Sequence, residues 1–189
     1  MMSDHNFLKK YFLDFKKLIQ EERYIKDLIS VKEVLKNTSL NNKKTMIFGN
    51  GGSAAIASHF SVDLTKNAKV RCVNFNEADL LTCFSNDFGY EHWVEKSIEY
   101  YADEGDVIVL ISASGESKNM INAVKAAKSK NIKNIITLTG NSKNNSLSKL
   151  GSINFWVDSK AYNHIENVHQ VLLLSVVDLI IGKSEYKPN

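Results

Sequence analysis

The chain has 189 residues, of which 43% are hydrophobic and 24% charged, a composition typical of a soluble globular protein. This length suits one ordinary α/β domain that buries its core without disulfide or metal staples. The net charge is +3, but the lysines are scattered and no basic cluster is interleaved with aromatic residues, so no nucleic-acid partner is expected. Cys72 and Cys83 are spaced unlike a metal knuckle, no signal peptide is expected, and the sequence has no run of 18 apolar residues. We therefore expect a cytoplasmic protein without a membrane span.

The N-terminal stretch, residues 4–36, carries apolar residues at helical spacing, which predicts one or two amphipathic helices. The apolar stripe is wide and rich in phenylalanine. Two interpretations stay open: the stripe packs on its own sheet, or it also covers a partner subunit.

From residue 45 onward, strand-like apolar runs alternate with helical patterns. Strands are expected over 45–48, 70–75, 107–111, 134–138 and 153–157. Helices are expected over 53–66, 77–84, 91–101, 117–130 and 164–181, with a polar loop at 85–89 and a helical turn at 146–150. This alternation predicts right-handed βαβ crossovers and a parallel sheet covered on both faces. No linker or repeat divides the chain, so residues 1–189 are expected to form one domain.

A glycine-rich loop follows the first expected strand and reads Gly49-Asn50-Gly51-Gly52-Ser53. Because it opens a helix, backbone N–H groups and the positive helix end face outward together, as in a phosphate cradle. Gly49-x-Gly51-x-x-Ala54 also fits a dinucleotide fingerprint, with Glu77 as its acid. The loop alone therefore leaves a nucleotide, a sugar phosphate or a plain tight turn as alternatives.

A second loop, residues 112–119, follows the buried run at 107–111 and reads Ser-Ala-Ser-Gly-Glu-Ser-Lys-Asn. Three hydroxyls beside a helix N-terminus suit a phosphate monoester, whose oxygens accept several hydrogen bonds at once. One serine alone would be read as a helix N-cap, but three favour the phosphate. In a parallel sheet both loops lie at the carboxyl ends of strands, where ligands bind.

These two loops, a His a few residues after the first and the run Asn86-Asp87-Phe88-Gly89 resemble the sugar isomerase (SIS) domain and, within it, the phosphoheptose isomerases. The resemblance spans roughly residues 44–181. It implies a three-layer, doubly wound, parallel five-stranded sheet of flavodoxin-like type with a long N-terminal helix. By this resemblance the substrate-binding residues are Asn50, Gly51, Gly52, Ser53, Asp87, Ser112, Ser114, Ser117 and Asn119, with the three loop serines holding the phosphate.

The resemblance also implies an activity and an assembly. The expected protein is a homotetramer that converts sedoheptulose 7-phosphate to a heptose phosphate for lipopolysaccharide or capsule sugars, often with bound zinc. Moving a carbonyl between C1 and C2 requires a base, a group that returns the proton, and stabilisation of the enediolate oxygen.

His59 and Asp63 are four residues apart and so share one helix face. In the resembled family this face carries a His and a Glu that bind metal, and the Glu also acts as base. The resemblance therefore implies a catalytic Asp63 and a zinc site at His59, Asp63 and Glu166, since imidazole and carboxylate suit zinc. The alternative is an ordinary hydrogen bond on a helix surface.

The last helix departs from the family pattern, which places a Gln and, eight residues later, a catalytic His. Alignment puts Glu166 at the Gln and Leu174 at the His, while Asn67 replaces a family arginine. A leucine neither binds zinc nor transfers a proton, so the family's acid/base pair does not carry over whole.

Three accounts of this departure stay open. Glu166 and Asp63 form a catalytic carboxylate pair, with His59 and a metal. Alternatively His169 or His164 supplies the missing imidazole, although a lone His on an inner helix face is more often structural. In the third account the chain keeps the sugar-phosphate pocket without the isomerase chemistry.

The leading hypothesis is an aldose–ketose isomerase that works by enediol proton transfer. The alternatives are a non-catalytic SIS protein that binds sugar phosphates or regulates, and an isomerase of a different sugar phosphate. The serine loop argues against a nucleotide-dependent enzyme.

Overall fold

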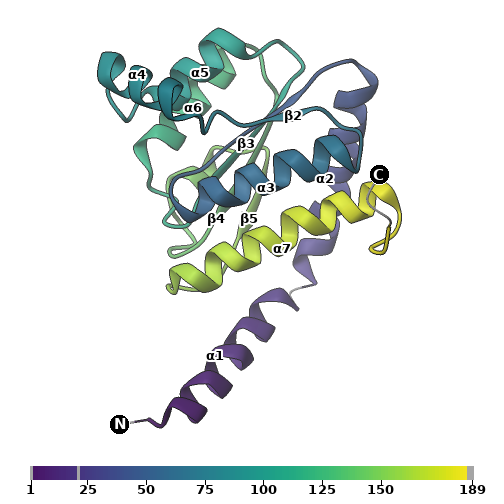
Figure 1. Ribbon diagram of the computed structural model, residues 1–189, viewed down its shortest axis with the longest axis vertical. Helices are drawn as coiled ribbons and strands as arrows, with labels where there is room; N and C mark the ends of the chain where they lie inside the picture. The colour runs from purple at the N-terminus through teal and green to yellow at the C-terminus, as the bar shows by residue number, and fades with distance from the viewer. Residues whose placement is uncertain (1, 21, 187–189) are drawn as a thin grey trace.

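The computed structural model describes residues 2–20 and 22–186, and Figure 1 shows its helices and strands. Five strands form one sheet in the order β2-β1-β3-β4-β5, and every neighbouring pair is parallel. Their bounds are β1 Thr45–Phe48, β2 Cys72–Val73, β3 Val107–Ser112, β4 Asn134–Thr139 and β5 Ile153–Trp156. This order is the flavodoxin-like, doubly wound one, which confirms the predicted fold class.

Helices cover both faces of the sheet, as expected for parallel strands that are buried on each side. Their bounds are α1 Asp4–Ile19, α2 Arg23–Leu40, α3 Gly52–Lys66, α4 Ala78–Phe88, α5 Trp93–Tyr101, α6 Lys118–Ser129 and α7 Tyr162–Ile181, with a short 3₁₀ helix at Leu147–Lys149. The core on one face joins α2, α3 and α7, and the core on the other joins α5 and α6, with α4 packed against it. Alternate residues of β1 point into the two cores, Ile47 into the first and Met46 into the second.

Helix α4 differs from the prediction, because it continues through residues 85–88 instead of ending in a polar loop. Phe84 and Phe88 lie one turn apart with ring centroids 5.9 Å from each other, and this contact favours the extra turn. Gly89, at φ 89°, then ends the helix. Strand β2 is shorter than predicted, since this edge strand pairs with β1 only at Cys72 and Val73.

The N-terminal stretch forms two helices, and α1 projects away from the sheet in Figure 1. Tyr11 and Phe15 pack their rings near His164 at the start of α7. No residue of α1 is buried, and Phe7 and Phe12 are 57% and 65% exposed. Part of the apolar stripe therefore packs on its own chain, and the rest is uncovered in the single subunit.

Helix α7, with a mean hydropathy of 1.4, is long and apolar enough to cross a membrane by length and composition alone. Its inner face, however, contributes Ile165, Val168, Leu172 and Val176 to the core beneath the sheet. The core helix of a globular domain can have the same length and composition, so the hydropathy of α7 is only weak evidence for a membrane span.

Candidate functional site

The glycine loop, residues 49–53, leads from β1 into α3. A side chain at Gly49 would place its Cβ 2.4 Å from the backbone of Ser53, and Gly51 has a φ of 55°. Both positions therefore favour glycine. No side chain caps the start of α3, but the N–H groups of Ser53 and Ala54 donate to the carbonyls of Asn50 and Gly51. The positive end of the helix dipole still faces this loop and favours an anion or a negatively charged oxygen there.

Glu166 of α7 lies directly against this loop. A Cβ added to Gly52 would come within 2.3 Å of a carboxylate oxygen of Glu166. The carboxylate thus occupies the space beside the first turn of α3, where the helix dipole favours negative charge. The structure places this predicted catalytic residue at the glycine loop.

The serine loop, residues 112–117, follows β3 and leads into α6. The Oγ atom of Ser112 lies 2.9 Å from that of Ser117 and 3.4 Å from that of Ser114. Ser117 stands at the N-cap position of α6, yet its side chain makes no capping hydrogen bond. The three hydroxyls therefore gather at one point beside a helix N-terminus, and the plain N-cap interpretation of Ser117 does not hold. This geometry suits a phosphate group.

A reciprocal pair of amide hydrogen bonds joins the glycine loop to the first turn of α6, into which the serine loop leads. Asn50 Nδ2 donates to Asn119 Oδ1 at 3.1 Å, and Asn119 Nδ2 donates to Asn50 Oδ1 at 2.8 Å. The hydroxyl of Tyr90 also donates to Asn50 Oδ1, at 3.0 Å. Tyr90 was not among the predicted site residues, although it directly follows the run 86–89 that carried the family resemblance; its partner Asn50 is 40 positions away in sequence.

Asp87 lies on the last turn of α4, where its described hydrogen bonds stay within that helix. Asn86 Nδ2 donates to it at 2.9 Å, and the Cys83 thiol lies 3.7 Å from its carboxylate. The charge of Asp87 raises the pKa of the Cys83 thiol. Among the described residues, no hydrogen bond joins Asp87 to either loop.

His59 and Asp63 form the expected pair on the outer face of α3, with Nε2 and Oδ2 3.2 Å apart. Two further amides join this pair. Asn67 Nδ2 donates to Asp63 Oδ1 at 3.3 Å, and Gln170 Nε2 of α7 lies 3.3 Å from His59 Nδ1. Gln170 follows Glu166 by one helical turn on the same face of α7, which runs beside α3 in Figure 1.

The predicted carboxylate pair of Asp63 and Glu166 is not assembled. The Glu166 carboxylate lies against Gly52, and Asp63 is 63 − 52 = 11 residues further along α3. At 1.5 Å per residue this separation along the helix axis is about 16 Å. Among residues 2–20 and 22–186, no three His, Cys, Asp or Glu side chains converge as a metal site would require.

The residues present therefore do not fit the zinc site that the resemblance implied. His59 and Asp63 supply two ligands, whereas zinc sites in proteins use three or four.

His169 lies in the core and does not reach the site surface. Its ring is completely buried, and Nε2 lies 3.0 Å from the carbonyl oxygen of Thr139, to which a neutral ring donates its proton. Burial lowers the pKa of His169 to about 4. The prediction of a catalytic His169 is therefore corrected: it is a structural histidine. His164 is also buried, against the ring of Tyr11 at a centroid distance of 4.2 Å.

The chain is similar in sequence and in structure to proteins of one known family. The family model described as SIS domain matches residues 10–140. The phosphoheptose isomerase of Sodalis glossinidius is 34% identical over 140 residues, which are 71% of this chain and 72% of that protein. The phosphoheptose isomerase of Fusobacterium nucleatum is 29% identical over 181 residues, 92% of each chain. The solved phosphoheptose isomerase from Neisseria gonorrhoeae superposes with a TM-score of 0.87 at 28% identity, covering 94% of this chain and 99% of the other.

Proposed function

The chain belongs to the SIS domain family and, within it, to the phosphoheptose isomerases, and we propose that it converts sedoheptulose 7-phosphate to a heptose 7-phosphate. One observation carries the proposal at the level of the site. Two ligand loops are linked by Asn50 and Asn119, and a carboxylate from α7 lies at one of them.

The serine loop is the phosphate end of this site. Three hydroxyls at the start of α6 offer several hydrogen bonds to one phosphate group, and such charge-assisted bonds are the strong ones. With the phosphate held there, the sugar chain extends past Asn50 and Asn119 toward the glycine loop.

Glu166 is the proposed base. No hydrogen bond from a described residue reaches its carboxylate, whereas both oxygens of Asp63 are engaged, one by His59 and one by Asn67. Glu166 removes the proton next to the carbonyl and returns it to the neighbouring carbon, so one carboxylate performs both transfers. The hydroxyl proton passes to the former carbonyl oxygen, and the positive end of the α3 dipole stabilises the enediolate.

A second candidate function is favoured by Leu174, which replaces the imidazole that the family carries. In this case the protein binds the sugar phosphate without isomerising it.

A proton-exchange experiment distinguishes the isomerase from the binding protein. Sedoheptulose 7-phosphate is incubated with the protein in deuterated water, with and without added zinc, and followed by NMR. We expect deuterium at the carbon next to the carbonyl, an aldose product, and no requirement for zinc. Binding without exchange would identify a sugar-phosphate-binding protein.

We further propose a cytoplasmic homo-oligomer, a homotetramer by family resemblance, that serves heptose synthesis for lipopolysaccharide or capsule. Support for the oligomer comes from α1, whose exposed phenylalanines have no cover within the subunit. Analytical ultracentrifugation measures the state directly, and a monomer at micromolar concentration would contradict the assembly.

A further inference from the structure

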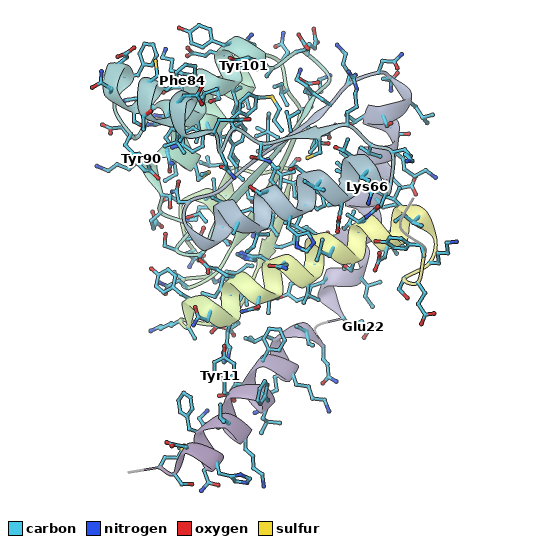
Figure 2. The ribbon with its side chains drawn as sticks, viewed as in Figure 1. Tyr11, Glu22, Lys66, Phe84, Tyr90 and Tyr101 are labelled. Carbon is cyan, nitrogen blue, oxygen red and sulfur yellow. The ribbon has the colours of Figure 1, made fainter. Side chains whose placement is uncertain are left out.

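Tyr90 lies beside the glycine loop, on the short segment between α4 and α5. Its hydroxyl donates to Asn50 Oδ1 at 3.0 Å, while 52% of the residue is exposed. In Figure 2 it lies at the edge of the molecule, between α4 and the first turn of α3. An exposed aromatic ring whose polar end is fixed on a ligand loop is available to a ligand that binds there.

The segment that carries Tyr90 is held on both sides. The N–H of His92 donates to the carbonyl of Gly89 at 3.0 Å, which closes a tight turn around Tyr90. Asn122 Nδ2 of α6 donates to the carbonyl of Glu91, also at 3.0 Å. The position of Tyr90 over the glycine loop is therefore built into the fold.

The hydrogen bonds of Asn50 show what the pair offers to a ligand. Both lone pairs of Asn50 Oδ1 are occupied, by Asn119 and by Tyr90, and one N–H of its Nδ2 binds Asn119. The second N–H of Asn50 Nδ2 has no partner among the described residues and is left as a donor. The Tyr90 oxygen, having given its proton to Asn50, can only accept. A sugar hydroxyl is both donor and acceptor and complements this pair.

We propose that Tyr90 orients the substrate by accepting a hydrogen bond from a hydroxyl of the bound sugar phosphate while it holds Asn50 in place. The inference rests on the proposed function for the identity of the ligand. It assigns the phosphate to the serine loop and the recognition of the sugar chain to the Tyr90–Asn50 pair.

The test compares Tyr90→Phe with the matched control Tyr100→Phe. Tyr100 is similarly exposed, at 62%, but lies on α5, where its ring packs near Phe84. Titration calorimetry measures the affinity of each variant for sedoheptulose 7-phosphate and for inorganic phosphate, and kinetics give KM and kcat. For Tyr90→Phe we expect about tenfold weaker sugar-phosphate binding and a raised KM, with phosphate affinity unchanged. Tyr100→Phe should match the wild type in every measurement.

Equal sugar-phosphate affinity in the two variants would overturn the proposal. An equal loss of inorganic phosphate affinity in Tyr90→Phe would also overturn it, because Tyr90 would then act on the loops as a whole. Calorimetry tests the role of Tyr90 in binding and does not depend on turnover. A wild type that binds the sugar phosphate but does not isomerise it therefore refutes the proposed function and leaves the role of Tyr90 testable. A wild type that does not bind this sugar phosphate refutes both.

Discussion

Gln170 of α7 places its Nε2 atom 3.3 Å from Nδ1 of His59 on α3, and this contact determines which ring nitrogen carries the proton. The amide nitrogen of glutamine only donates, so Nδ1 accepts and the proton lies on Nε2. That nitrogen faces Asp63 Oδ2 at 3.2 Å. Gln170, His59 and Asp63 thus form one directed chain of hydrogen bonds between two helices.

Gln170→Leu should release His59 from its single tautomer. Because the donor to Nδ1 is lost, ¹⁵N NMR of the imidazole should show a mixture of tautomers where the wild type shows Nε2–H. We expect isomerase activity to stay within a few-fold of the wild type, because the proposed proton transfers are made by Glu166 and not by His59. The control is Asn167→Ala on the same helix, where the side chain only bonds the carbonyl of Asn163. A wild-type NMR pattern in Gln170→Leu would show that Asp63 alone orients the ring.

Glu166→Gln should abolish proton exchange while sugar-phosphate binding persists. The amide has nearly the shape of the carboxylate but takes up no proton, and a positioned base typically contributes 10²–10⁴-fold. We therefore expect deuterium incorporation to drop at least about a hundredfold. Glu77→Gln is the control, since Glu77 is exposed and lies outside both loops. If Glu166→Gln keeps most of its exchange activity, the base is another group, with Asp63 the first to examine.

The sequence predicted the two ligand loops because each is a continuous run with its own chemistry. The first loop has three glycines in four residues and the second has three serines in six, so each is recognised without reference to the rest of the chain. The fold class followed from alternating patterns for the same reason. Helix α4 was misjudged where Asn86 and Asp87 indicated a loop locally, and the contact between Phe84 and Phe88 outweighed them.

Contacts between distant elements could not be predicted in this way. The pairing of Asp63 with Glu166 failed because it depends on the register of α7 against α3, which packing sets. Gln170 and Tyr90 bind partners 111 and 40 positions away. Neither the run 86–89 beside Tyr90 nor the candidates Glu166 and His169 beside Gln170 predicted those partners. The sequence predicted a departure from the family at Leu174, and the structure shows an amide one turn earlier, Gln170, in contact with His59.

Ser114→Ala and Ser117→Ala should each weaken sugar-phosphate binding by about 1.5–3 kcal/mol, the range for hydrogen bonds to a charged group. Calorimetry with both sedoheptulose 7-phosphate and inorganic phosphate should show the same loss, because these hydroxyls contact the phosphate in the proposed complex. Ser184→Ala, exposed near the C-terminus, should bind both ligands normally. Undiminished affinity in both loop variants would mean that the phosphate binds elsewhere.

His169 should make stability fall in acid without affecting catalysis. Its pKa is lowered by burial from 6.5 to about 4, so the unfolded chain takes up a proton more readily than the folded one. The contribution of the neutral ring is complete above pH 6.5 and is lost as pH falls toward 4, by about 3 kcal/mol at pH 4 on a scale of 1.36 kcal/mol per pKa unit.

Denaturant unfolding between pH 7 and pH 4 measures this loss. His169→Gln has no titrating group and keeps a donor for the Thr139 carbonyl, so its stability should depend less on pH, while His5→Gln should behave like the wild type. Isomerase activity of His169→Gln at pH 7 should stay within a few-fold of wild type, since the ring touches only the core. If a folded His169→Gln variant lost as much isomerase activity as Glu166→Gln, His169 would have to be a catalytic residue.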